Sequence, residues 1–140
     1  MTINKATYYA LCAAMQMARA PDRRTTVGEV AALYGLPDTA LAKVFQQLVR
    51  AKLARGARGI GGGYTLARSP AAITVLEVIS ALEPDRALHL TLPPVASGRA
   101  PADVPDGPLR RLFDEVDVLL RSTFASVSLE TLVGRRRRVL

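Results

Sequence analysis

The 140-residue sequence has few of the residues that crosslink chains or ligate metals. It contains one cysteine, one histidine and no tryptophan, and only 5% of it is aromatic. One cysteine excludes an intramolecular disulfide and favours a reducing compartment, so we expect a cytoplasmic protein. No apolar run reaches the ~18 residues that a membrane span requires. Because 49% of the residues are hydrophobic, we expect one core of helices packed by leucine, alanine and valine.

Acidic residues are scarce in the first half of the chain. Residues 1–70 hold ten lysines and arginines against three acids, whereas residues 71–140 hold nine of each. The whole net charge of +7 therefore lies in the first half. Such an excess favours a polyanionic partner there, such as nucleic acid. The alternative is an ordinary solvated basic surface.

Capping signals and apolar periodicity predict two helices before residue 36. The first is expected from about Asn4 to Ala20, with its apolar residues at helical spacing. Thr26 and Glu29 stand at the spacing of a capping box, which begins the second helix. Gly35 is expected to end that helix, since glycine accepts the left-handed conformation.

A third helix is predicted from residues 37–38 to about residue 50. Either Pro37 lies in its first turn or Asp38 caps it. Its core-facing stripe is predicted to be Leu41, Val44, Phe45, Leu48 and Val49. The opposite face carries small, amide-bearing or basic residues: Thr39, Ala40, Ala42, Lys43, Gln46, Gln47 and Arg50. Two helices joined by a short glycine turn indicate a helix-turn-helix, the alternative being a helical hairpin of a small bundle.

Arginines and glycines are concentrated in residues 50–64. A basic helix end, a short strand, a glycine cluster and a returning strand at Tyr64–Leu66 predict a β-hairpin wing behind the helix-turn-helix. An arginine on a narrow glycine-rich tip can enter a DNA minor groove. The glycines also resemble a phosphate-binding loop, but such a loop needs a helix directly after it. A nucleotide site is therefore not expected.

The second half of the chain divides into three parts. Thr74 and Glu77 form a second potential capping box, which opens a helix to about Leu82. Residues 83–108 contain six prolines and little periodicity, so we expect a loop or linker and a possible sensor region. We therefore assign residues 1–82 to DNA binding, 83–108 to this loop, and 109–140 to a dimerisation helix with a basic tail.

A long amphipathic helix is predicted after the loop. Its apolar stripe must be buried, most simply against the same helix of a second copy, and consists of Leu109, Leu112, Phe113, Val116, Leu119 and Leu120. A short last helix is expected over Ser128–Val133. The tail Arg135–Arg138 either adds nonspecific DNA affinity or is simply solvated.

This order of elements resembles the Rrf2 family of bacterial winged-helix regulators, and the match covers nearly the whole chain. The family includes an iron–sulfur cluster regulator, a nitric-oxide-sensitive repressor and a cysteine-metabolism repressor. The wing segment is the most specific part of the resemblance. The matching segments are Lys5 with Tyr9-Ala10-Leu11, Gly35-Leu36, Arg58–Ala67, Ile73–Ile79 and Ser128–Leu132.

The resemblance implies a fold that is mainly α with a small β-hairpin: a winged helix-turn-helix with a long C-terminal dimerisation helix. It also implies a homodimeric, sequence-specific transcriptional regulator, a repressor, that binds double-stranded DNA at a palindromic operator. At matched positions Thr39, Ala40 and Ala42 are implied to meet base edges, and Arg58 to enter the minor groove. The predicted DNA-binding residues are Lys5, Thr26, Thr39, Ala40, Ala42, Lys43, Gln46, Gln47, Arg50, Arg55, Arg58, Gly61, Gly62 and Tyr64.

Two departures from the family pattern bear on function. Ile60 stands where the family often has proline, which changes the wing tip. Cluster-binding members carry three cysteines in the loop before the long helix, whereas this loop has none, and Gly107 stands near the last position. One cysteine supplies too few thiolates for an iron–sulfur cluster. We therefore predict no cofactor and no metal. The signal, if there is one, is an unidentified small-molecule or redox effector.

The isolated reactive side chains give weaker hypotheses. Cys12 could be a redox switch if it were exposed with a lowered pKa, but a small buried residue of an alanine-rich helix is the interpretation we prefer. His89 and Asp85 would supply only half of a metal site. No catalytic constellation occurs, so we do not expect an enzyme. The alternative functions are a winged-helix module that docks a protein partner and a nonspecific DNA-binding protein.

Overall fold

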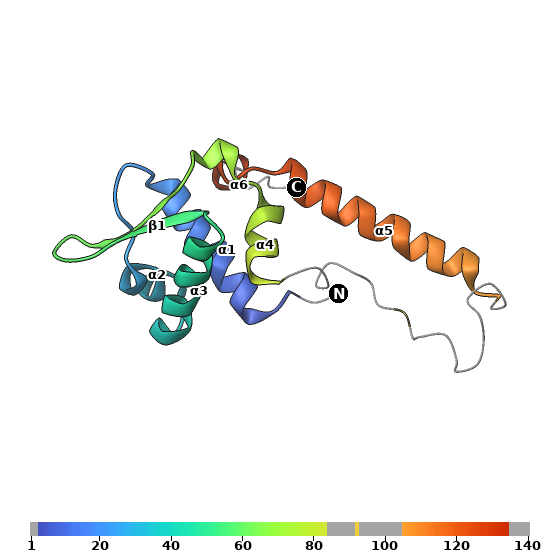
Figure 1. Cartoon of the computed structure of the whole chain (residues 1–140), viewed down its shortest axis with the longest axis horizontal. Coiled ribbons are helices and arrows are strands. Elements are labelled where there is room, and N and C mark those ends of the chain that lie inside the picture. The colour runs from blue at the N-terminus through green and yellow to red at the C-terminus, as the bar shows by residue number, and fades with distance from the viewer. Residues whose placement is uncertain (1–2, 84–91, 93–104, 135–140) are drawn as a thin grey trace, which may run out of the picture.

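The computed structural model describes residues 3–83, 92 and 105–134. These residues form a mainly helical structure with one two-stranded hairpin, which confirms the predicted fold class (Figure 1). The elements are α1 (Lys5–Arg19), α2 (Val27–Tyr34), α3 (Asp38–Arg50), β1 (Ala54–Ala57), β2 (Gly63–Leu66), η1 (Pro70–Ala72), α4 (Val75–Leu82), α5 (Gly107–Ser126) and α6 (Leu129–Gly134). The hairpin and α5 project from opposite sides of the packed helices.

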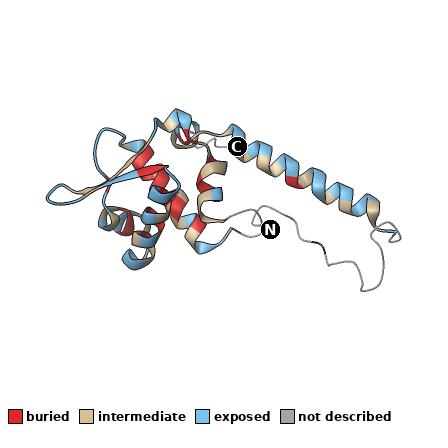
Figure 2. Cartoon of the chain, in the orientation of Figure 1, coloured by how far each residue is buried: buried red, intermediate tan, exposed pale blue. Residues whose placement is uncertain are grey.

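Helix α1 is the centre of the core. Its buried face carries Ala10, Ala13, Ala14 and Met17, each at most 1% exposed. Helices α3, α4 and α6 pack against it. The alanines bring these helices close together, and Figure 2 shows that the buried residues lie on the faces that meet there. This rigid core holds α3 and the hairpin in a fixed relation.

The starts of the first two helices agree with the sequence-based predictions. The Asn4 side chain accepts a hydrogen bond from the Thr7 amide at 2.8 Å and caps α1. The Thr26 hydroxyl accepts from the Glu29 amide at 3.1 Å, and the Glu29 carboxylate accepts from the Thr26 amide at 3.3 Å. This reciprocal pair confirms the capping box of α2. Gly35 ends α2 with a φ of 65° in the left-handed region.

Helix α3 corrects two predictions. Pro37 occupies the N-cap position without a side-chain hydrogen bond, and Asp38 is the first helical residue, so neither proposed start was right. Leu41, Val44, Phe45 and Leu48 are buried as predicted, but Val49 is 37% exposed. Val49 lies eight residues after Leu41, about 80° further round the helix, which is at the edge of the apolar stripe. It faces the hairpin side of α3.

The predicted capping box of α4 forms only in part. The Thr74 hydroxyl accepts a hydrogen bond from the Glu77 amide at 3.1 Å. The Glu77 carboxylate pairs with Arg68 instead of returning to the Thr74 amide. The short helix η1, which the sequence did not predict, has its proline in the first turn and carries the chain from the hairpin to α4.

The end of α5 is joined to the same core. The Val75 amide donates to the Val127 carbonyl at 2.9 Å, and the Leu129 amide donates to the Ile73 carbonyl at 2.8 Å. Leu129 is fully buried, and α6 packs against α1 and η1. The core therefore includes residues from the C-terminal segment as well as from residues 3–82.

Some predictions fall on parts of the chain outside the described residues. These are most of the predicted loop, with Asp85 and His89, and the tail Arg135–Arg138. Among the helices that are described, none has the length and hydropathy to cross a membrane.

Candidate nucleic-acid interface

The predicted reading face of α3 is the face that the core leaves accessible. Thr39, Lys43, Gln46 and Arg50 are exposed there. The other predicted residues of this helix are half-buried: Ala40, Ala42 and Gln47. A helix that buries one stripe and presents small, amide and basic side chains on the other face is suited to contact base edges and phosphates.

The wing, defined as residues 54–66, is tied to α3 and to the loop before α2. Its strands pair antiparallel, with Gly56 opposite Tyr64. The Tyr64 ring stacks on the buried Phe45 ring of α3, with centroids 4.5 Å apart. Tyr64 and Thr25 exchange two backbone hydrogen bonds of 2.8 Å. Tyr64, predicted as a DNA-binding residue, thus joins three elements beneath the interface.

A groove of about 490 Å³ separates α3 from the wing. It brings together the predicted residues Gln46 and Arg50 from α3 and Arg58 and Tyr64 from the wing. Val49, which the sequence assigned to the core, also lines it. The groove is open and has basic side chains on both walls, so an anionic chain could contact both walls at once.

A second groove, of about 360 Å³, lies on the other side of α3. Lys5 and Tyr9 of α1 line it together with Ala40, Lys43 and Gln47 of α3. The predicted residue Lys5 therefore lies beside the reading face although it is far from α3 in the sequence. Arg55 lies elsewhere, in a hollow behind the wing with Lys52 and Arg68, two residues that the sequence analysis did not select.

The wing tip, residues 58–62, depends on its glycines. Gly59 and Gly61 have φ values of 93° and 75°, which side-chain-bearing residues rarely adopt. The Gly62 amide donates to the Gly59 carbonyl at 2.8 Å. A Cβ on Gly62 would lie 2.7 Å from the Ala57 carbonyl oxygen and 2.8 Å from that of Gly59. These contacts explain the glycine cluster, which holds Arg58 on an exposed, narrow tip.

Among the described residues, the cations of this surface lack acidic partners. Within the described residues, no ion pair involves the predicted DNA-binding cations Lys5, Lys43, Arg50, Arg55 and Arg58. Arg23 and Arg68, in contrast, are paired with Glu29 and Glu77. A cation without a carboxylate partner keeps its full attraction for phosphate.

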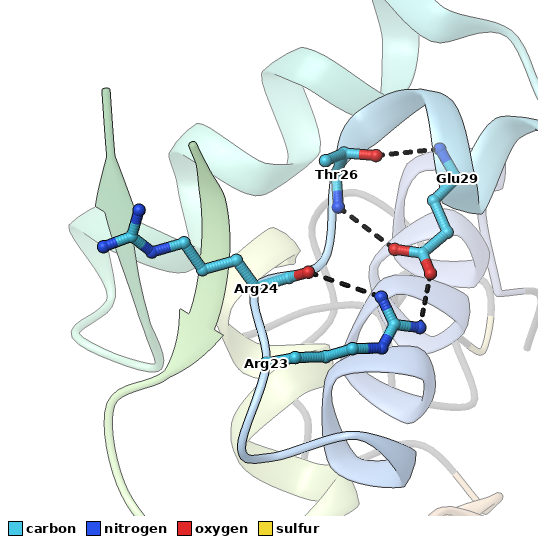
Figure 3. Close-up of polar contacts among 4 residues, drawn as sticks. All are labelled: Arg23, Arg24, Thr26 and Glu29. Carbon is cyan, nitrogen blue, oxygen red and sulfur yellow. Dashed lines mark hydrogen bonds and ion pairs between the residues drawn. The ribbon is translucent and has the colours of Figure 1, made fainter. Parts of the chain in front are cut away.

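Two residues of the loop before α2 bear on the candidate interface, and Figure 3 shows their side chains. Thr26 was predicted to bind DNA, and its hydroxyl oxygen accepts the capping hydrogen bond from Glu29. Arg24 was not predicted, yet its guanidinium donates to the Gly61 carbonyl at 2.9 Å. No local sequence pattern signals this contact, because the two residues are 37 positions apart.

Cys12 lies on the buried side of α1, where it is 4% exposed. Burial raises the pKa of its thiol, and the smaller effects of a Tyr8 hydrogen bond and of Arg19 act in the opposite direction. That hydrogen bond also raises the pKa of the Tyr8 hydroxyl. A buried thiol with a raised pKa is the environment of an unreactive cysteine rather than of a redox switch.

A helix-turn-helix with an accessible second helix, followed by a glycine-tipped wing, defines the winged helix-turn-helix class of DNA-binding proteins. The model of the Rrf2 family, described as iron-dependent transcriptional regulators, matches residues 3–135. The chain therefore belongs to the Rrf2 family, as the sequence motifs indicated, and is a DNA-binding transcriptional regulator.

Known relatives agree with this assignment. The chain is 32% identical over 133 residues to a protein named as the HTH-type transcriptional regulator BadM of Rhodopseudomonas palustris, covering 95% of this chain and 81% of that protein. The fold of this chain is similar to that of CymR, the global cysteine regulator of B. subtilis. The TM-score is 0.81 at 24% identity, with coverage of 98% of this chain and 99% of that chain. T. potens IscR has a TM-score of 0.74 and 19% identity, with coverage of 99% and 94%.

The family is described as iron-dependent, but this chain has too few cysteines to ligate an iron–sulfur cluster through thiolates. The sequence has one cysteine, and that residue is buried in α1. An iron–sulfur cluster is generally held by several thiolates. In the described residues no group of three histidine, cysteine, aspartate or glutamate side chains could hold a metal ion.

Proposed function

We propose that the chain is a dimeric repressor that binds a palindromic operator and carries no iron–sulfur cluster. The observation that carries this proposal is the set of cations in the two grooves that flank α3, which have no acidic partner among the described residues. Lys5 and Lys43 lie in one groove, and Arg50 and Arg58 in the other. Phosphates on both sides of a major groove would then be neutralised while α3 occupies the groove itself.

Different residues supply affinity and specificity in this proposal. Thr39, Ala40 and Ala42 are in the first turns of α3, where a recognition helix meets base edges. A threonine hydroxyl can hydrogen-bond a base, and an alanine methyl can contact a thymine methyl. Arg58 enters the minor groove from the wing tip and favours narrow, A·T-rich segments. The cations of the grooves position the protein without reading sequence.

Helix α5 is the proposed dimerisation element. Its 20 residues extend for about 30 Å. Leu109, Leu112 and Leu119 are 48%, 53% and 65% exposed, and Phe113, Val116 and Leu120 are half-buried. Figure 2 shows how little of α5 is covered within one chain. Packing against α5 of a second copy would bury this stripe.

The three assigned segments then have separate tasks. Residues 1–82 read DNA, residues 109–140 hold the dimer together and also contribute α6 to the core, and residues 83–108 connect the two parts. An effector acting on this connection would change DNA affinity only if it prefers one spacing of the two reading helices. A protein of this kind acts on the chromosome in the cytoplasm and performs no catalytic step.

Selection of duplexes from a random-sequence pool tests the proposal. We expect a palindrome whose half-sites are about one helical turn apart, roughly 34 Å. Affinity for the selected duplex should fall steeply with salt, and Arg58→Ala should weaken binding by about 1–3 kcal/mol. Sedimentation of the protein with one duplex gives the stoichiometry, for which we expect two chains per site. Recovery of no shared motif, with weak salt dependence, would instead favour the protein-docking module.

A further inference from the structure

We propose that Arg24 is a positioning residue that fixes the wing tip, and with it Arg58, for DNA binding. Arg24 lies in the loop between α1 and α2, outside the elements that a winged helix-turn-helix uses to read DNA. Its contact is made to the wing itself. The inference rests on the proposed function, because it assumes that Arg58 enters the minor groove.

The guanidinium of Arg24 reaches across to the wing tip. Its Nη1 atom donates to the Gly61 carbonyl oxygen at 2.9 Å. Figure 3 shows the side chain extending toward the strands, on the opposite side of the loop from Arg23. The next residue, Thr25, is paired with Tyr64 through two backbone hydrogen bonds of 2.8 Å. Thr25 therefore holds β2 at Tyr64, near the start of the strand, while Arg24 holds the tip.

The loop that carries Arg24 is itself held in place. Arg23 makes an ion pair with Glu29, whose carboxylate also accepts the Thr26 amide in the capping box. The loop approaches the wing closely, since a Cβ on Gly63 would lie 2.8 Å from the Thr25 carbonyl oxygen and 3.3 Å from the Arg24 Cβ. Arg24 thus extends from a fixed backbone, so its hydrogen bond constrains the wing rather than the loop.

The acceptor of this bond is coupled to Arg58. Gly61 lies three residues after Arg58 in the same turn, which is closed by the hydrogen bond from the Gly62 amide to the Gly59 carbonyl. Three of the glycines in and beside this turn have positive φ. The backbone of a glycine can also adopt many other conformations, so the turn is free to rearrange. Holding the Gly61 carbonyl removes part of that freedom before DNA arrives, which lowers the ordering cost of binding.

The test compares Arg24→Gln with Arg111→Gln, which removes the same charge from an exposed position of α5, the helix that projects away from the wing (Figure 1). Both are measured in the full chain with a fluorescein-labelled duplex from the selection experiment, at several salt concentrations. Arg58→Ala and the Arg24→Gln/Arg58→Ala double variant complete a cycle. The order parameters of residues 58–62 and the exchange rate of the Gly62 amide, measured by NMR without DNA, report on the tip directly.

We expect Arg24→Gln to weaken binding about three- to tenfold, as the loss of one solvent-exposed hydrogen bond suggests. The slope of affinity against salt should not change, and Arg24→Gln should have no effect when Arg58 is already alanine. Without DNA, Arg24→Gln should lower the order parameters of the tip and speed Gly62 exchange. Arg111→Gln should change affinity less than twofold and leave the tip unaffected.

Three results would overturn the proposal, and they have different meanings. A salt slope reduced by about one, with a full effect in the Arg58→Ala background, would make Arg24 a direct phosphate contact. An unchanged tip and unchanged affinity in Arg24→Gln, with Arg58→Ala still weakened, would remove the positioning role and leave the proposed function intact. Unchanged affinity in Arg58→Ala alone would reject the minor-groove role of the wing, and the role of Arg24 with it.

Discussion

Replacement of Gly62 by alanine should open the wing tip and weaken DNA binding more than it weakens the fold. The added Cβ would lie 2.7 Å and 2.8 Å from two backbone carbonyl oxygens, closer than real Cβ atoms come. Inserting a methyl group into a packed site costs about 1–3 kcal/mol. Opening the tip instead loses the 2.8 Å hydrogen bond from Gly62 to Gly59, which costs about 0.5–1.5 kcal/mol. The exposed tip should therefore open, which is the cheaper response.

An opened tip moves Arg58 away from its DNA position. If Arg58 contributes about 1–3 kcal/mol to binding, Gly62→Ala should raise the dissociation constant about 5- to 150-fold. The free energy of unfolding should fall by no more than about 1.5 kcal/mol, the upper estimate for the tip hydrogen bond. Fluorescence anisotropy with the selected duplex measures the first quantity, and urea unfolding followed by circular dichroism measures the second.

The matched control is Gly107→Ala, in the first turn of α5. A Cβ on Gly107 would meet nothing within 4 Å, and α5 projects away from the wing (Figure 1). We expect this variant to bind the duplex as the parent protein does. Parent-like affinity in Gly62→Ala would refute the reasoning, because it would mean that the closed tip does not matter for binding. A large loss of stability would show that the tip cannot open separately from the fold.

Three further predictions concern other parts of the chain. Leu119→Glu places a charge on the proposed dimer stripe, so sedimentation should find monomers, and a persistent dimer would reject α5 as the interface. Native Cys12 should react with a thiol-specific disulfide reagent far more slowly than the unfolded chain, because the thiol is buried with a raised pKa. Equal rates would restore the redox hypothesis. The hydrogen bond from Arg23 lowers the pKa of Glu29 from its ordinary value of 4.5, so on acidification the unfolded chain binds a proton at this position first. The stability from this pair is thus present above about pH 4.5 and is lost as pH falls through the lowered pKa. Below pH 5 the melting temperature of Glu29→Gln should therefore depend less on pH than that of the parent protein. The same pH dependence in both proteins would contradict this.

Short-range signals in the sequence predicted much of the fold. The capping box of α2 is specified by Thr26 and Glu29, three residues apart, and Glu29 can satisfy both the Thr26 amide and Arg23. The same pattern at Thr74 and Glu77 was only half right, because Arg68, nine residues earlier, takes the Glu77 carboxylate. Local spacing indicates which hydrogen bonds are available, but tertiary neighbours decide which of them form.

The parts of the candidate site that sequence reasoning missed depend on long-range contacts. Arg24 reaches the wing only because Thr25 pairs with Tyr64, 39 residues later in the sequence. Val49 follows the apolar period of α3 but lies where the helix faces the wing groove, so periodicity alone misplaced it. The glycine-rich tip was recognisable, since its composition is needed locally for positive φ.

The attachment of α5 determines how the proposed dimer could be controlled. Two backbone hydrogen bonds, from Val75 to Val127 and from Leu129 to Ile73, fix the end of α5 to the start of α4. Leu129 is buried in the core that also positions α3. Because this end of α5 has no free linker, a change in how two α5 helices cross would move each reading helix with its core as one body. An effector would therefore not need to deform the DNA-binding domain, but only to favour one crossing of the α5 helices over another.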